Sequence, residues 1–189
     1  MGTRAILAVA VLGLAVVSPL VATFDAEANK VGDFRDVCKK VVVAPMECPP
    51  DLNCLRLETD LVALLRVHAG LQVIGAAAVR KALFDLGLST DAPDLRERML
   101  DHFEADAIVV AGVPGFEVQS KGATAVWTGT TMIAAPNERK IGATTLAVIG
   151  RDGRKLLEGS AQGSSKNPYR TEQGFVAKMF RLILEKAFK

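Results

Sequence analysis

Ionisable side chains gather over six residues in the middle of the chain: Asp101, His102, Glu104 and Asp106. Carboxylates beside an imidazole are the groups of a metal site or of acid–base chemistry, so one interpretation is a hydrolase that uses Asp101, His102 and Glu104. The other interpretation is a solvated helix end, with His102 where a cation is favoured. Asp101 and Glu104 would repel each other at this helical spacing without a bound cation. Of the two interpretations, we favour the solvated helix end.

Other reactive residue types lack the surroundings that their chemistry needs. Ser160, Ser164 and Ser165 stand in no Gly-x-Ser-x-Gly turn. The segment 73–77 resembles the start of a dinucleotide-binding turn but lacks the further glycines that let backbone approach a pyrophosphate. His68 falls on the apolar side of its expected helix, which favours a core histidine. We expect no catalytic set, no cofactor and no resident metal.

Three cysteines are present. Cys48 and Cys54 flank a Pro-Pro-Asp-Leu-Asn turn, so we predict a local disulfide between them. Pairing Cys38 with Cys48 would join the ends of an extended segment, beyond the reach of a disulfide. Cys38 would then remain free, buried where a strand begins.

Basic residues mark the C-terminal region. We expect them to form one basic face that could dock a partner. They are Lys166, Arg170, Lys178, Arg181, Lys186 and Lys189. An ordinary solvated helix face explains them as well. The sharper interpretation is binding to an anionic partner, which could be an acidic protein patch, a phospholipid surface or a wall polymer; a basic face alone does not choose among these.

The N-terminal residues are typical of a secretory signal peptide. Arg4 precedes an apolar run over residues 5–17, which fits a signal core and is shorter than a membrane span. Cleavage is compatible with Ala22 or Ala28, so we expect a signal peptide over 1–28 and a single domain over 29–189. No cysteine follows the run closely enough for lipid attachment. We expect a periplasmic protein that is soluble rather than lipid-anchored.

Composition excludes further classes. The formal net charge of +2 does not indicate a nucleic-acid-binding protein. No later stretch is long and apolar enough to span a bilayer. A homo-oligomer is compatible with the sequence, which leaves the oligomeric state open.

Hydrophobic periodicity predicts the elements of the first half. A β-branched run at 39–45 predicts a strand, and leucines at helical spacing from Leu57 predict a helix that Gly70 ends. A short strand at 71–74, helices at 76–86 and 95–103, and a strand at 107–113 follow. Strand, helix and strand in this order imply a right-handed crossover and parallel pairing.

The second half changes character. We predict antiparallel strands at 116–134, 141–149 and 155–163, with a turn at 136–139 and an Asp152-Gly153 hairpin. An amphipathic helix at 171–188 closes the chain. The predicted fold class is α/β with α+β character in the second half, built on a mixed sheet with the last helix packed on it.

Several phrases resemble a superfamily of bacterial envelope proteins that includes the curli secretion channel CsgG, the amino-terminal domain of TolB, LpoB and FlgO. They are VVVAPME at 41–47, the segment 57–89, FEADAIVVAGV at 103–113 and the segment 141–163. The resemblance implies a non-enzymatic periplasmic module that docks on envelope machinery. These phrases are packing signatures, so the resemblance transfers no functional residues.

The sequence therefore favours an exported, non-enzymatic partner-binding or assembly factor of the cell envelope. The first alternative is a small-ligand-binding protein, with a pocket above the ends of the parallel strands near residues 45–51, Gly75 and residues 112–115. The second alternative is the hydrolase. Few polar groups converge on the loops that follow the strands, which favours partner binding.

Overall fold

The computed structural model describes residues 22–90, 92–127, 132–166 and 170–188. Its strands are β1 Ala22–Lys30, β2 Lys40–Val43, β3 Gln72–Ile74, β4 Ala107–Trp127, β5 Met132–Gly150 and β6 Lys155–Ser165. Its helices are the 3-10 turn η1 Phe34–Asp36, α1 Cys54–Leu64, the π turn η2 Leu65–Ala69, α2 Ala76–Asp85, α3 Leu95–His102 and α4 Glu172–Ala187.

The strands form one six-stranded mixed sheet in the order β1-β6-β5-β4-β2-β3. β2 pairs in parallel with β3 and with β4, whereas β4, β5, β6 and β1 pair antiparallel in turn. The predicted fold class is confirmed: a parallel β-α-β start, an antiparallel meander and a C-terminal helix on the sheet. The content of the sheet and helices is that of an α+β fold.

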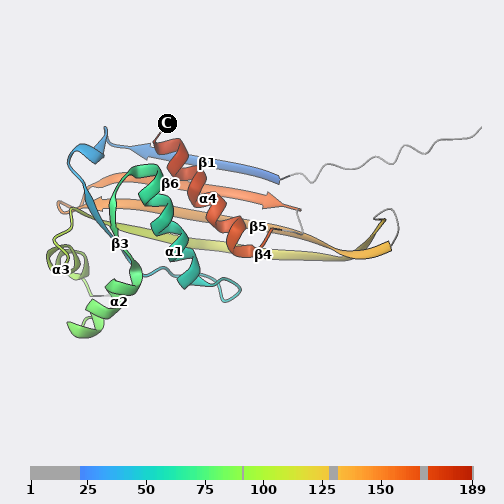
Figure 1. Ribbon diagram of the computed structural model, residues 1–189, viewed down its shortest axis with the longest axis horizontal. Helices are drawn as coiled ribbons and strands as arrows, with labels where there is room; N and C mark the ends of the chain where they lie inside the picture. The colour runs from blue at the N-terminus through green and yellow to red at the C-terminus, as the bar shows by residue number, and fades with distance from the viewer. Residues whose placement is uncertain (1–21, 91, 128–131, 167–169, 189) are drawn as a thin grey trace, which may run out of the picture.

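Helices cover the two faces of the sheet unequally. α1 and α4 lie side by side on one face (Figure 1), where Leu61, Phe180 and Ile183 belong to the larger core cluster. α2 and α3 cover the other face only at the parallel end, where Leu83 and Met99 pack with other apolar residues in a smaller core cluster. The rest of that second face, over β1, β6, β5 and β4, carries no helix in the part of the chain that the structure describes.

Glycines at two strands allow α4 to lie close to the sheet. A Cβ atom on Gly159 of β6 would stand 2.3 Å from Cγ2 of Ile183, and one on Gly142 of β5 would stand 3.0 Å from the ring of Phe175. Side chains alternate along a strand, so the neighbours of these glycines point to the uncovered face.

β4 and β5 form a longer ribbon than the sequence predicted. β6 pairs with β5 only from Lys140 onward, so the ribbon of β4 and β5 continues past the end of β6, as Figure 1 shows. The turn predicted at 136–139 is wrong, because β5 contains these residues. The strand predicted at 116–134 is confirmed in part, because residues 116–127 belong to β4 and residues 132–134 belong to β5. Pro136 pairs opposite Ala123, beside a register shift in β4. Proline is tolerated at such irregularities because no ladder donor is lost there.

β1 is a strand that the periodicity did not predict. It pairs over its full length with β6, from Ala22 opposite Ser165 to Lys30 opposite Leu157. Phe24 places its ring 5.4 Å from that of Phe175 on α4. The residues after Ala22 therefore complete the sheet, although cleavage at Ala28 was left open above.

Candidate functional site

A groove of about 710 Å³ runs between α4 and the neighbouring α1 and η2. We name it the basic groove. It is lined by Asp60, Ala63, Leu64, Val67, His68, Arg170, Gly174, Ala177, Lys178 and Arg181. Small and aliphatic side chains line it, together with cationic groups from Arg170 and α4.

The two walls of the basic groove have separate local causes. Thr171 caps α4 by accepting a hydrogen bond from the N–H of Gly174, so the helix starts just after Arg170. On the other wall, α1 widens into the π turn η2 before Gly70 ends it in the left-handed conformation, at φ 66°. π turns inside helices occur frequently at functional sites.

The π turn explains why the sequence prediction assigned His68 to the wrong face of the helix. We expected a core histidine, but His68 is only partly buried and lines the basic groove with Val67, which is 77% exposed. A π turn holds more residues than an α turn, so helical extrapolation from Leu57 assigns these positions to the wrong face.

Two cations of the groove stand over one aromatic ring. The Lys178 ammonium lies 4.4 Å, and the Arg170 guanidinium 5.5 Å, from the centre of the Phe24 ring on β1. Partial burial lowers the pKa of Lys178 below its usual value, and the charges of Arg170 and Arg181 lower it further. The groove therefore holds positive charge that its own surroundings compensate only in part.

Arg170 carries the clearest mark of an absent partner. Its Nη1 atom is buried and has no hydrogen-bond acceptor among the described residues. Burying such a donor without an acceptor is costly, more so when it is charged. Arg181 differs, because Nε donates to Glu185 at 2.8 Å. Arg170 is therefore the less satisfied of these two guanidinium groups.

The six basic residues predicted for one face do not all gather. Arg170, Lys178 and Arg181 meet in the basic groove. Lys166 is exposed after the end of β6 and does not line the groove. Lys186 donates to the carbonyl oxygen of Ala26 at 2.5 Å, and Lys189 lies outside the described residues.

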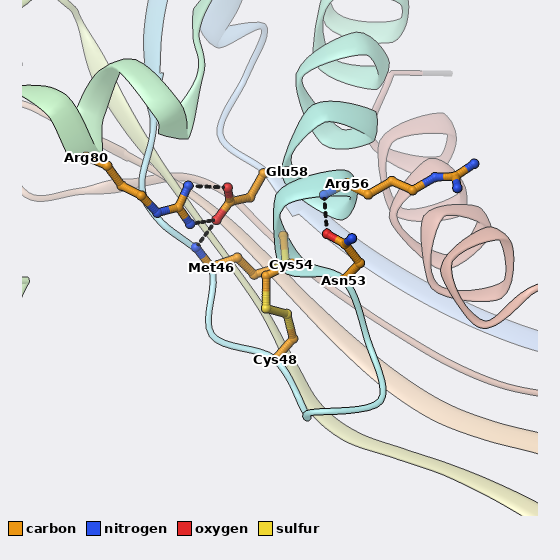
Figure 2. The surroundings of a disulfide bond; sticks show 7 residues. All are labelled: Met46, Cys48, Asn53, Cys54, Arg56, Glu58 and Arg80. Carbon is orange, nitrogen blue, oxygen red and sulfur yellow. Dashed lines mark hydrogen bonds and ion pairs between the residues drawn. A yellow bond between two sulfur atoms is a disulfide. The ribbon is translucent and has the colours of Figure 1, made fainter.

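The α1 wall of the groove is anchored by a buried carboxylate. Glu58 is 3% exposed, and its side chain accepts hydrogen bonds from the backbone N–H of Met46 at 2.7 Å and from both terminal nitrogens of Arg80 on α2 (Figure 2). The predicted disulfide between Cys48 and Cys54 closes the loop that leads into α1. α1, α2 and the loop after β2 are thereby tied together.

The ionisable residues at 101–106 do not converge on one site, and two of them make structural contacts. Arg151 donates to Asp101 at 2.5 Å and to the carbonyl oxygens of Leu100 and Ala105, which fixes α3 to the β5–β6 turn. Asp106 accepts from the backbone N–H groups of Lys39 and Lys40 at 2.8 and 2.9 Å.

The other two members of the cluster, His102 and Glu104, lie in separate surroundings. His102 stacks edge-on against the ring of Phe103 at 4.7 Å, and Glu104 occupies a turn with φ 49°. Among the described residues, no group of three or more His, Cys, Asp or Glu is arranged to hold a metal ion.

The pocket expected near the ends of the parallel strands is small. One hollow of about 370 Å³ lies between Glu47, Pro49 and Pro114, and another of about 300 Å³ lies between Leu55 and Gly75. Both are smaller than the basic groove.

The uncovered side of the sheet has the opposite charge. We name it the acidic sheet face, and its outward residues include Thr23, Asp25, Glu27, Asn29, Glu117, Thr145, Glu158, Ser160 and Gln162. It bears two hollows, one of about 770 Å³ that includes Asp25 and Glu117 and one of about 370 Å³ that includes Glu27 and Glu158. Within the described ranges, neither hollow is lined by a lysine or an arginine.

Among the side chains that the structure describes, two cations lie at the ends of this face. Lys155 pairs with Glu158 at 2.5 Å, and Arg139 donates to the Ser164 hydroxyl at 3.4 Å. Asp25 and Glu27 form no ion pair with any residue that the structure describes. The acidic sheet face thus exposes carboxylates that could accept cationic groups.

Known families and curated proteins do not resemble the chain closely enough to match it. No family model matches the chain, and no curated protein matches it. Where the structure describes the chain, no helix has the length and apolarity to cross a membrane.

Solved structures of two bacterial proteins are similar. The PelC dodecamer from Paraburkholderia phytofirmans has a TM-score of 0.51 at 13% identity and covers 88% of this chain and 100% of its own. Lipoprotein GNA1162 from Neisseria meningitidis has a TM-score of 0.50 at 19% identity and covers 78% of this chain and 96% of its own. The chain therefore shares its fold with these two proteins.

Proposed function

We propose that this chain is an exported, non-catalytic accessory factor of the bacterial envelope that works by docking an acidic protein surface in its basic groove. The observation that carries the proposal is the gathering of Arg170, Lys178 and Arg181 around the basic groove. The groove is open and is lined in part by small and aliphatic side chains, which suits a protein surface better than an enclosed small molecule.

An acidic protein is favoured over a phospholipid surface by the shape of the site. The cations line one wall of a groove that also contains the carboxylate Asp60. A lipid surface would prefer cations spread over a convex face with apolar residues reaching outward. A hollow with a mixed rim instead fits a protruding protein element that presents carboxylates and one or two polar donors.

A periplasmic location without a lipid anchor belongs to the same proposal. Each of the three cysteines is accounted for, since Cys48 and Cys54 are joined and Cys38 is 1% exposed in the core. This arrangement of the cysteines supports the proposal of a mature chain without a lipid anchor. GNA1162 is a lipoprotein, and that property is not transferred to this chain.

Assembly is a second part of the proposal, supported by the similar structure of PelC, which is a dodecamer. A subunit that docks protein surfaces suits the assembly role that the sequence resemblance implies. CsgG, TolB and LpoB remain resemblances of sequence only.

In-cell photo-crosslinking tests the proposal. A photoreactive residue at Val67 in the groove should give protein adducts in the envelope, and Arg170→Glu should remove them. The same residue at Phe84, which is 87% exposed on α2 away from the groove, serves as the matched control. Equal adducts from both positions, or adducts from Val67 that survive Arg170→Glu, would reject the groove as the docking site.

A further inference from the structure

The chain carries two oppositely charged surfaces that face away from each other. The basic groove lies on the helix-covered side of the sheet, and the acidic sheet face lies on the opposite side of β1, β6, β5 and β4. A single copy cannot bring them together, because the sheet separates them.

We infer that the acidic sheet face of one copy docks on the basic groove of a second copy, so that the protein assembles head to tail. This inference rests on the proposed function, because it names the acidic protein surface that the groove accepts. Each copy then offers one groove and one face, and every contact joins different surfaces.

Charge complementarity carries the pairing. In the groove, Arg170, Lys178 and Arg181 gather around one hollow, and the charges of Arg170 and Arg181 act on Lys178. On the face, Asp25 and Glu27 present exposed carboxylates that no described cation neutralises. Docking would give each group the partner that it lacks within its own chain, and a charge-assisted bond to Arg170 is the stronger kind of hydrogen bond.

The acidic sheet face is large enough to dock a subunit. The nine residues of β1 extend roughly 30 Å at ~3.3 Å per residue, and the three steps from β1 to β4 span roughly 15 Å at ~4.8 Å each. These lengths give a flat area of roughly 450 Å², and a stable interface needs about 800 Å² of accessible surface on each partner, so the side chains that protrude from the face must supply the remainder.

Edge-to-edge pairing, the other symmetric use of β1, is opposed by its residues. Antiparallel pairing of two β1 edges about Ala26 would set Asp25 opposite Glu27 of the other copy, and like charges directly across a ladder are destabilising. Lys186 of α4 also donates a hydrogen bond to the carbonyl oxygen of Ala26.

A head-to-tail contact leaves one free surface of each kind at the ends of any row. Such heterologous contacts continue until they close into a ring or grow as a filament. The inference therefore predicts an oligomer with more than two subunits.

Sedimentation velocity of the purified full mature chain tests the inference through charge reversal. At 50 mM salt the chain should form species larger than a dimer, and at 500 mM salt these should dissociate. A groove variant, Arg170→Glu with Lys178→Glu, and a face variant, Asp25→Lys with Glu27→Lys, should each be monomeric at 50 mM salt, with self-association weakened at least tenfold.

Mixing the two variants is the decisive arm. The groove variant keeps an acidic face and gains an acidic groove, whereas the face variant keeps a basic groove and gains a basic face. Together they should assemble again as alternating copies, which variants that fail to fold could not do. Lys81→Glu with Asp85→Lys on α2 is the matched control, since it reverses an exposed pair remote from both surfaces, and it should assemble like the parent.

The outcomes separate this inference from the proposed function. A chain that is monomeric at 50 mM salt and high concentration, or an assembly that neither reversal affects, or a mixture that stays monomeric, would overturn self-docking. If Val67 still crosslinks to a different envelope protein in those cases, the proposed function stands. Should the variants unfold, isotope-mixed crosslinking from Val67 decides, because self-docking requires adducts with residues 22–30 or 155–165 of a second copy.

Discussion

The two sides of the stretch β1-β6-β5-β4 differ although the same strands build them. On the helical side β6 presents Leu157, Gly159 and Ala161, all buried beneath α4. On the open side the alternating residues Glu158, Ser160 and Gln162 are exposed. Small residues on one side admit a helix, and polar residues on the other side keep the sheet uncovered. The strand alternation thus separates a surface that stabilises the fold from a surface that is available for docking.

β1 belongs to both sides, so its loss should have the largest effect. A chain beginning at Asn29 lacks seven of the nine β1 residues, including Phe24, which packs on Phe175 and lies beneath Arg170 and Lys178. Losing a packed Phe alone costs about 3–5 kcal/mol. We expect the free energy of unfolding to fall by at least about 4 kcal/mol, as measured by urea denaturation.

A chain beginning at Thr23 is the matched control for this truncation, and it should keep the stability of the intact domain. N-terminal sequencing of the exported protein should accordingly find cleavage after Ala22. Equal stability of the two truncated chains would show that β1 contributes little to either side of the sheet.

A pair of adjacent substitutions in β6 separates the two sides directly. Gly159→Val adds a Cβ atom that would stand 2.3 Å from Cγ2 of Ile183 and 2.9 Å from the carbonyl oxygen of Glu27. Overpacking of this kind costs up to about 3 kcal/mol, so thermal and urea unfolding should show a loss of that size. Ser160→Val changes the neighbouring residue on the open side and should alter stability by less than about 0.5 kcal/mol. Similar losses for both variants would contradict the asymmetry.

The anchoring of the α1 wall is the third test. Glu58→Ala leaves the Met46 N–H buried without its acceptor and removes the partner of Arg80. Because Arg80 is 37% exposed and can turn to water, we expect a loss of about 2 kcal/mol rather than the full cost of a broken buried pair. Urea unfolding measures the loss.

Lys81→Ala is the control for Glu58→Ala, since the pair of Lys81 with Asp85 is exposed and should contribute less than about 0.5 kcal/mol. Hydrogen exchange adds a readout for the comparison of the two sides. Protection should fall in α1 while the paired amides of β6 stay protected, and a uniform fall would show that Glu58 supports the whole fold instead.

Local signals in the sequence were enough for most of the fold. Gly70 ends its helix in the left-handed conformation, and Gly153 turns the β5–β6 hairpin at φ 81°, as the turn chemistry predicted. The disulfide followed from two cysteines around a proline turn. β1 was missed because its alternation of exposed and half-buried residues was assigned to a leader segment, and only pairing with β6 makes it a strand.

The site was less predictable, because it depends on which elements become neighbours. The basic residues Arg170, Lys178 and Arg181 were found by type, yet nothing local shows that Lys186 turns to Ala26 instead of the groove. Val67 and His68 join the groove only through the π turn, which helical periodicity does not signal. The acidic sheet face is spread over four strands that are distant in sequence.

Thiol reactivity compares the helical side and the open side of the sheet with the smallest expected change in the structure. Cys38 lies in the core cluster of the helical side, 1% exposed, and burial raises the pKa of its thiol to about 11, with the charge of Asp106 adding to the effect. At pH 8 only about one thiol in a thousand is then ionised, against roughly a quarter for an exposed cysteine with a pKa near 8.5. Modification by an aromatic disulfide reagent should be at least a hundredfold slower for native Cys38 than for a cysteine introduced by Ser160→Cys on the open side. Because the folded state favours the neutral thiol, its contribution to stability is complete below about pH 9 and is lost as the pH rises toward 11. Equal modification rates for the two thiols would mean that the helical side opens as readily as the acidic sheet face.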